Sequence, residues 1–389
     1  MKKICITTPE FPPEQWGGLA RTAGKVAGHA RDMGLDVHVA HLVVVSDRWV
    51  LLDENRETTE AGGITYHRIA VAKEKFATSE RELWDCPHTL TLQMMYQSLE
   101  MLHRAEAFDL FHSFFLYPIG YVTGLLARRV KVPSIGTIVG NDVKKYGFSP
   151  EKAAVCRIGL ENADRIAALS RDLMEMADAI APVEHKTSIV YNSVDLPLRQ
   201  WCRNREKEDP FRIGCAGIFK YAKGLPYLFK AAGALASRDV QLVLAGVVRS
   251  SEEHVLREML FSSGMEKRTT WVGAVEHDRM PDWLQSLDVF VLPSLTEGCP
   301  NILMEAMAAG LPCVATRTGA VEELLEHDIS GLLVPWGDSA SLSSALAEIM
   351  HNPEKARAFG SAARKRMEAF SRDREFQSWI SLYRELIEF

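Results

Sequence analysis

The 389-residue sequence has few of the features that mark membrane-bound, secreted or nucleic-acid-binding proteins. No stretch approaches the roughly 18 consecutive apolar residues that a membrane-spanning helix needs. The seven cysteines form an odd, scattered set without a CxxC pair, so neither a disulfide framework nor a zinc site is indicated. The net charge of −6 argues against a nucleic-acid partner, which would need a basic face. We therefore expect a soluble protein with reduced thiols in the cytoplasm.

Two other signals are missing near the N-terminus. Met1 to Thr8 carries two lysines but no long apolar segment, so we interpret it as a first strand and not as a signal peptide. No GxGxxG motif follows this strand, which disfavours a nicotinamide-dependent oxidoreductase. Short basic runs at residues 128–131 and 364–366 are interpreted as solvated helix faces, and a peripheral contact at the inner face of the membrane is the alternative.

What the sequence does contain is a repeated alternation of apolar strands with helical segments. A chain of this length needs more than one core, and a charged, aperiodic stretch at residues 196–210 indicates a linker. We predict an α/β protein with two doubly wound, Rossmann-like domains that face each other across a ligand-binding cleft. Their predicted bounds are 1–200 and 201–372, with a final helix at 373–389 that packs back on the first domain.

The most informative stretch runs from Leu292 to Gly310. An apolar strand enters a polar turn that contains Glu297, and a helix is predicted to begin near Asn301, after Pro300. Glu305 is the only charged residue between Gly298 and Thr316, on a helix that otherwise has the pattern of a buried one. Such a carboxylate needs a hydrogen-bond donor, which a ligand hydroxyl would supply. The alternatives are that Glu305 pairs with a Lys or Arg side chain or faces solvent in the first turn, where acidic residues are common. The N-terminus of this helix is suited to bind a phosphate.

Other candidate residues lie where predicted strands end. Gly17 and Gly18 precede a helix, and Lys220 and Lys223 lie in a strand-to-helix loop that can place an ammonium group beside a phosphate. A further set of polar residues follows strands of the first domain: His112, Asp142 and Asn192. A buried structural histidine and a helix cap are the alternative interpretations of the first two.

Together these motifs resemble the GT-B-fold retaining glycosyltransferases of family four, the glycogen-synthase-like group 1 enzymes. The resemblance rests on Gly17-Gly18, on the Lys-Gly that ends Phe219–Gly224, on Asn192-Ser-Val-Asp195, and on the Glu-x7-Glu signature of Glu297 and Glu305. The chain departs from the family pattern at Ile218, where an arginine is usual, at Phe114, where a second histidine is usual, and at Ser193, where a glycine is usual.

The resemblance implies transfer of a hexose-type sugar from a nucleotide-diphosphate donor to a hydroxyl acceptor, with retention of configuration. The acceptor would be a sugar, a lipid-linked sugar or another hydroxyl compound, and no metal or other cofactor is expected. Glu297, His112 and Lys223 are the implied catalytic residues. Donor contacts are implied for Gly17, Gly18, Lys220, Lys223, Gly298, Cys299, Pro300, Asn301, Ile302 and Glu305, and Asp142 and Asn192 are further residues of the crevice. A catalytically weak nucleotide-sugar-binding protein and a sugar phosphorylase are the alternatives.

Overall fold

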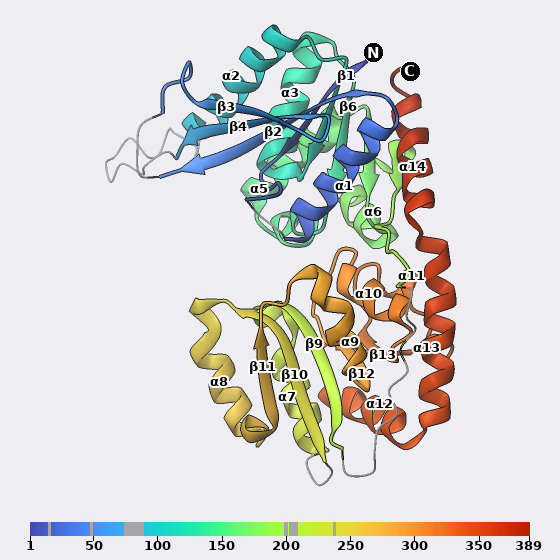
Figure 1. Ribbon diagram of the computed structural model, residues 1–389. Coiled ribbons are helices and arrows are strands. Elements are labelled where there is room, and N and C mark those ends of the chain that lie inside the picture. The colour runs from blue at the N-terminus through green and yellow to red at the C-terminus, as the bar shows by residue number, and fades with distance from the viewer. Residues whose placement is uncertain (15–16, 47–49, 74–88, 198–200, 202–208, 236–238) are drawn as a thin grey trace. The chain divides into compact units, whose positions relative to one another are not determined.

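The chain forms two units, which the computed structural model describes except for residues 15–16, 47–49, 74–88, 198–200, 202–208 and 236–238 (Figure 1). Unit 1 contains Met1–Tyr191 and Phe376–Phe389, and unit 2 contains Asn192–Glu375. The division therefore falls between Tyr191 and Asn192, whereas the sequence analysis placed it after residue 200. The last residues of the chain belong to unit 1.

Within the described residues, unit 1 is built on an eight-stranded sheet in the order β3-β4-β2-β1-β5-β6-β7-β8. Its strands are β1 (Lys3–Thr8), β2 (Asp36–Val45), β3 (Arg56–Ala61), β4 (Ile64–Ala72), β5 (Leu110–Phe114), β6 (Ser134–Ile138), β7 (Arg165–Ala168) and β8 (Thr187–Ile189). All neighbouring pairs are parallel except β3 and β4, which are antiparallel. The edge strand β3 has an exposed side chain at every position. Its polar sequence lacks the apolar alternation that would predict a strand.

Helices cover both faces of this sheet. They are α1 (Gly18–Asp32), α2 (Thr89–Glu106), α3 (Tyr121–Val130), α4 (Asn141–Lys144), α5 (Pro150–Asn162) and α6 (Arg171–Asp178), with the C-terminal part of α14 (Arg372–Arg384). Side chains of β1 alternate between the two faces: Ile4 and Ile6 pack in the core that contains α1 and α14, and Cys5 packs in the core that contains α2 and α3. This alternation fixes the register of the central strand.

Unit 2 has a six-stranded, entirely parallel sheet in the order β11-β10-β9-β12-β13-β14. Its strands are β9 (Phe211–Phe219), β10 (Val240–Val248), β11 (Thr269–Gly273), β12 (Val289–Leu292), β13 (Cys313–Thr316) and β14 (Leu332–Val334). Its helices are α7 (Leu225–Ala234), α8 (Glu253–Ser262), α9 (Met280–Gln285), α10 (Asn301–Ala309), α11 (Val321–Leu324), α12 (Ser339–His351) and α13 (Pro353–Met367). The predicted helix start at Asn301 coincides with the start of α10.

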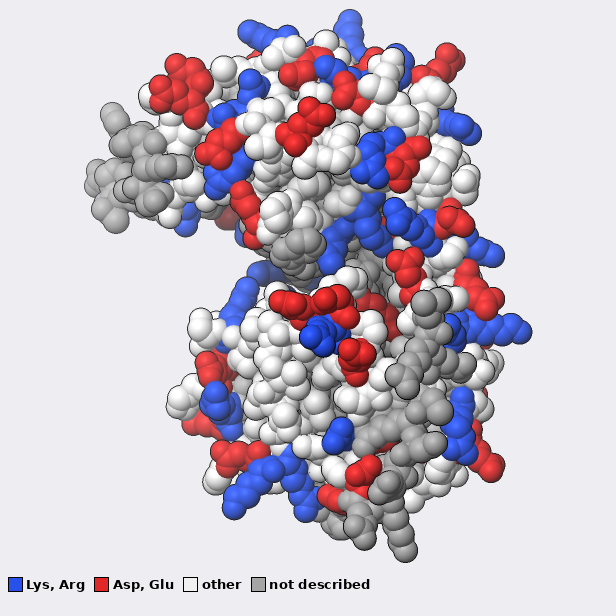
Figure 2. Space-filling model, in the orientation of Figure 1, with Lys and Arg blue, Asp and Glu red and all other residues white. Residues whose placement is uncertain are grey.

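Both faces of this second sheet are also buried, which explains why its strands are continuous apolar runs. In β12, Val289 and Val291 pack in the core with α7, α8 and α12, and Phe290 and Leu292 pack in the core with α9, α10 and α13. The predicted α/β class with two doubly wound sheets is confirmed. In Figure 2, acidic and basic side chains are interspersed over the visible face of unit 2.

Candidate functional site

The strand order of unit 2 reverses between the adjacent strands β9 and β12. Open parallel sheets bind ligands outside the carboxyl ends of their strands at such a point. Strand β9 ends at Phe219 and is followed by Lys220 and the turn Tyr221–Lys223, and β12 ends at Leu292 and is followed by the segment that carries Glu297. The two loops that the sequence analysis assigned to the donor therefore leave the sheet side by side.

The structure joins these two loops through an ion pair. Lys223 Nζ lies 2.7 Å from Glu297 Oε1, and the side chains are 23% and 10% exposed. The hydroxyl of Ser294 donates a second hydrogen bond to the same carboxylate oxygen at 2.6 Å. A positive and a negative group are thus held together, partly shielded from solvent, at the ligand-binding edge of the sheet.

Two glycines allow the backbone approach that brings the pair together. Gly224 has φ +69°, and a β-carbon there would lie 1.8 Å from the carbonyl oxygen of Pro293. Gly319 has φ +58°, and a β-carbon there would lie 2.3 Å from the carbonyl oxygen of Glu297. A hydrogen bond of 2.9 Å from the Leu295 amide to the carbonyl of Ala222 also links the loops. No residue with a side chain fits at either glycine without moving a loop.

Helix α10 begins directly after this loop. Pro300 is its N-cap and supplies no side-chain hydrogen bond, so the first turn at Asn301 and Ile302 depends on other groups to satisfy its amides. Gly298 and Cys299 are half-buried in the loop before it. Glu305 is half-buried one turn into the helix, where Met304 and Ala306 are fully buried. The helix therefore presents an amide-rich end and one carboxylate at the same edge.

One further donor candidate, Lys220, and one predicted crevice residue, Asn192, lie in unit 2. Lys220 is half-buried at the N-cap of the Tyr221–Lys223 turn. Asn192 is buried, and its side-chain amide donates to the carbonyl of Cys299 at 3.2 Å. The structure thus gives Asn192 a role in supporting the loop that precedes α10.

In unit 1, Gly17 and Gly18 form the N-terminus of α1. Gly17 is the N-cap, and a β-carbon there would lie 3.1 Å from Glu10 Oε2, whereas a β-carbon at Gly18 would meet nothing within 4 Å. Burial raises the pKa of the Glu10 carboxyl group. A side chain at the first position would thus press on the Glu10 carboxylate, and a side chain at the second position would meet no neighbour.

The structure places His112 in the interior of unit 1. Its side chain is fully buried, with Nδ1 2.7 Å from the Tyr383 hydroxyl and Nε2 2.7 Å from the Thr137 hydroxyl. Burial lowers its pKa to about 3, so the ring is neutral at pH 7. Both ring nitrogens are thus engaged inside unit 1, which is the environment of a buried structural histidine, the alternative interpretation of this residue.

Asp142 also lies in the interior of unit 1. Its side chain is fully buried and accepts hydrogen bonds from the backbone amides of Val139 and Gly140 at 3.0 and 2.7 Å. Burial raises the pKa of its carboxyl group, against the effect of these amide donors. Asp142 therefore closes the turn after β6 and does not face a crevice.

Profiles of two protein families match most of the chain. One, described as Glycosyl transferases group 1, matches residues 202–366, and another, described as Glycosyl transferase 4-like domain, matches residues 17–193. The protein belongs to the group 1 glycosyltransferases. The D-inositol 3-phosphate glycosyltransferase of Paenarthrobacter aurescens is 24% identical over 387 residues, which cover 91% of this chain and 93% of that protein. The N-acetyl-alpha-D-glucosaminyl L-malate synthase of Bacillus anthracis is 23% identical over 295 residues, 72% of this chain and 76% of that protein.

Solved structures agree on the fold of this glycosyltransferase. Sucrose-phosphate synthase from Thermosynechococcus elongatus superposes with a TM-score of 0.77 at 20% identity, over 99% of both chains. Anabaena HepE, solved in complex with UDP and glucose, superposes with a TM-score of 0.75 at 18% identity, over 99% of this chain and 100% of that one. The predicted GT-B fold and the resemblance to group 1 are confirmed.

One residue in contact with the Lys223–Glu297 pair was not singled out from the sequence. Ser294 is fully buried and hydrogen-bonded to Glu297, and its own carbonyl accepts a 2.5 Å hydrogen bond from the Thr316 hydroxyl. A serine three residues before a glutamate is the spacing of a local side-chain contact, and this signal was available in the sequence.

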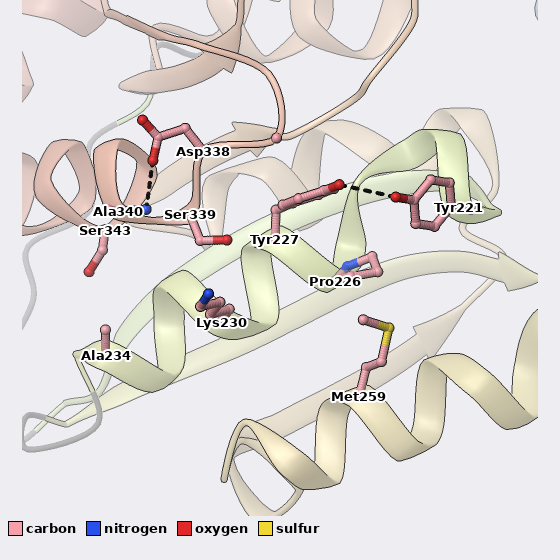
Figure 3. Close-up of a pocket in the computed structure, with 11 residues that line it drawn as sticks. Tyr221, Pro226, Tyr227, Lys230, Ala234, Met259, Asp338, Ser339, Ala340 and Ser343 are labelled. Atoms are coloured by element: carbon pink, nitrogen blue, oxygen red, sulfur yellow. Dashed lines mark hydrogen bonds between the residues drawn. The ribbon is translucent and has the colours of Figure 1, made fainter.

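A separate pocket of about 470 Å³ lies on unit 2 among α7, α8 and the start of α12 (Figure 3). The hydroxyls of Tyr221 and Tyr227 meet there at 3.1 Å. Lys223 and Glu297 do not line it. In the part of the chain that the structure describes, no helix is long and apolar enough to cross a bilayer, and no cluster of three or more potential metal ligands is present.

Proposed function

We propose that this glycosyltransferase transfers a hexose-type sugar from a nucleoside-diphosphate donor to a hydroxyl group, with retention of anomeric configuration, and that unit 2 binds the donor. The observation that carries the proposal is the Lys223–Glu297 pair at the point where the strand order of unit 2 reverses. Family membership supports the class of reaction. The position of the pair supports the choice of donor site.

In the proposed complex, the ammonium group of Lys223 and the first-turn amides of α10 face the donor diphosphate. Glu305 accepts hydrogen bonds from the ribose hydroxyls, and Glu297 binds the donor sugar. Lys220 supplies further positive charge beside the diphosphate, in place of the arginine that is absent at Ile218. The contacts of Gly298, Cys299 and Pro300 with the donor involve backbone atoms only.

The chemistry requires one bond to break and one to form on the same face of the sugar. The bond between the anomeric carbon and the diphosphate oxygen breaks, and its electron pair stays on the diphosphate. The acceptor oxygen bonds to the anomeric carbon, and the leaving phosphate oxygen takes the acceptor proton. Lys223 and the amides of α10 stabilise the negative charge that grows on the leaving group.

We also propose that transfer needs no metal ion and occurs in the cytoplasm. The first part rests on the positive charge that Lys223 and the N-terminus of α10 already supply. Activity that is unchanged after treatment with EDTA is the expected result. Activity that is lost with EDTA and restored by a divalent cation would contradict this part of the proposal.

Donor binding is tested by thermal unfolding with UDP, GDP and ADP. UDP is the first choice because the related HepE structure was solved with UDP and glucose. A nucleotide at about 100 times its dissociation constant should stabilise the protein by about 2.7 kcal/mol. The Lys223→Met and Glu305→Gln variants should lose most of this shift, and Lys230→Ala, which removes an exposed lysine of α7, should keep it.

Transfer is tested by supplying UDP-sugars with a panel of acceptors and recording the anomeric coupling of the product by NMR. Retention of configuration is expected. Nucleotide binding with neither transfer nor donor hydrolysis would support a binding protein instead. Release of sugar 1-phosphate from a glycoside by inorganic phosphate would indicate a phosphorylase. No binding of any of the three nucleotides would refute the donor site.

A further inference from the structure

A group of aromatic rings and lysines lies at the carboxyl edge of the sheet of unit 1. We name it the aromatic–lysine cluster: Phe115, Tyr117, Tyr146, Lys145 and Lys152. Phe115 and Tyr117 follow β5, and the other three follow β6. Strands β5 and β6 are parallel neighbours, and the Phe115 amide donates to the carbonyl of Thr137 at 3.1 Å. The strand order of this sheet reverses next to β5, between β1 and β5. The cluster therefore occupies a ligand-binding position of the fold.

The rings are arranged around Tyr146. The centroid of Phe115 lies 5.7 Å from that of Tyr146, with an angle of 87° between the planes, and the centroid of Tyr117 lies 5.4 Å away at 73°. The ammonium group of Lys152 is 4.4 Å from the Tyr146 centroid and 5.3 Å from that of Tyr117, and Lys145 is 5.8 Å from Tyr146. Two cations thus lie against aromatic rings of the cluster.

The ammonium groups of Lys145 and Lys152 are not paired with carboxylates of the described residues. Within the described residues, no Asp or Glu oxygen lies within 4.0 Å of the ammonium nitrogen of Lys145 or Lys152. Lys144 differs, since its ammonium group lies 2.5 Å from Asp172. The nearby Asp142 carboxylate is fully buried and engaged with backbone amides. An anion bound here would therefore not have to displace a carboxylate.

The backbone around the cluster is fixed. Phe115 has φ +80°, a conformation that non-glycine residues rarely adopt and that concentrates at functional sites. Helix α5, which carries Lys152, packs closely on the segment after Tyr117, because a β-carbon at Gly159 would lie 3.2 Å from the amide nitrogen of Tyr121. Tyr117, Tyr146 and Lys152 are each half-buried. The rings and the charge are thus held in place before a ligand arrives.

We propose that the aromatic–lysine cluster binds the acceptor, and that the acceptor is a saccharide that carries a phosphate or carboxylate group. This inference rests on the proposed function, because it assigns the second substrate of the same reaction. The sugar ring packs on the exposed parts of Tyr117 and Tyr146, whose faces offer a flat apolar surface. The anionic group contacts the ammonium groups of Lys152 and Lys145.

Binding is tested by saturation-transfer NMR with two matched pairs, mannose 6-phosphate against mannose and glucuronate against glucose. We expect the anionic member of each pair to bind at least about tenfold more tightly. Lys152→Ala should remove this difference, Lys152→Arg should restore most of it, and Tyr146→Ala should weaken both members of a pair. Lys365→Ala, an exposed lysine of α13, is the control and should change nothing.

Three results would overturn the inference. The first is equal affinity for the anionic and neutral sugars, and the second is an equal loss of affinity in the Lys365→Ala variant. The third is binding to phosphatidylserine vesicles that needs Lys152 while free anionic sugars do not bind, which would indicate a membrane contact near the exposed Phe148. The UDP-induced thermal shift is measured in every variant. Its absence in the unmodified protein would refute the donor site, whereas its retention with no preference for anionic sugars would refute the acceptor class alone.

Discussion

Substitution of Gly224 tests whether the backbone holds Lys223 beside Glu297. An alanine β-carbon at this position would lie 1.8 Å from the carbonyl oxygen of Pro293, so one of the two loops must move by about an ångström or more to relieve the overlap. Gly224 also has φ +69°, which adds about 1–2 kcal/mol for a residue with a side chain. We expect Gly224→Ala to cost about 3–5 kcal/mol in total, the range of the most destabilising single substitutions.

Gly264→Ala is the matched control for this substitution. Gly264 lies in the same unit with φ +72°, and a β-carbon there would meet nothing within 4 Å. It carries the conformational cost without the overlap, so the expected loss is about 1–2 kcal/mol, or about 2–8 °C in melting temperature for a domain of this size. The difference between the two variants therefore measures the contact between the loops.

The assay is thermal unfolding followed by circular dichroism, with and without UDP. Gly224→Ala should lower the melting temperature at least about twice as far as Gly264→Ala and should lose the UDP-induced shift, because Lys223 no longer faces the diphosphate. If both variants unfold at the same temperature and both keep the UDP shift, the contact at Pro293 does not position the lysine. Lys223 would then reach Glu297 without the close approach of the two loops at Gly224.

Two further predictions concern the interior of unit 1. Because the pKa of His112 is lowered from 6.5 to about 3, its stabilising effect is complete above pH 6.5 and is lost as the pH falls toward 3. Between pH 7 and pH 5 this loss is about 2 kcal/mol of unfolding free energy. In urea unfolding, the unfolding free energy of His112→Gln should therefore fall by about 2 kcal/mol less than that of the unmodified protein over this pH range. An equal fall in both proteins would contradict the burial of a neutral His112. Trp379 is fully buried, so Trp379→Ala should cost about 3–5 kcal/mol by calorimetry. Phe389→Ala, at a side chain that is 39% exposed, should cost much less.

Much of the fold followed from local pattern. The strand and helix around Glu297 were predictable because an apolar run, a proline and an asparagine mark a strand end and a helix start within one short stretch. Strand β3 was not predictable from the sequence, because all of its side chains are exposed and its sequence has no apolar alternation. The two units divide at Asn192, before the predicted bound of 200, and Asn192 supports a loop more than a hundred positions away, at Cys299.

The sequence indicated individual residues of the candidate site but not the contacts between them. Lys223 and Glu297 were each found at the end of a strand, but their ion pair depends on the close approaches at Gly224 and Gly319, which local sequence does not reveal. The position of His112 at the end of β5 was predicted correctly. Its burial was not, because the partner that encloses it, Tyr383, comes from the last helix of the chain. Contacts between distant segments decide which polar residues at a sheet edge can meet a ligand.

The place of the last helix has a consequence for biosynthesis. Trp379, Leu382, Tyr383 and Ile387 complete a core whose other members come from the first 190 residues. During translation, the last core residues of unit 1 are therefore synthesised only after the whole of unit 2. A chain released directly after residue 375 would have the whole sequence of the second unit, while its first unit would expose an unfilled apolar face, a state that favours aggregation or capture by chaperones.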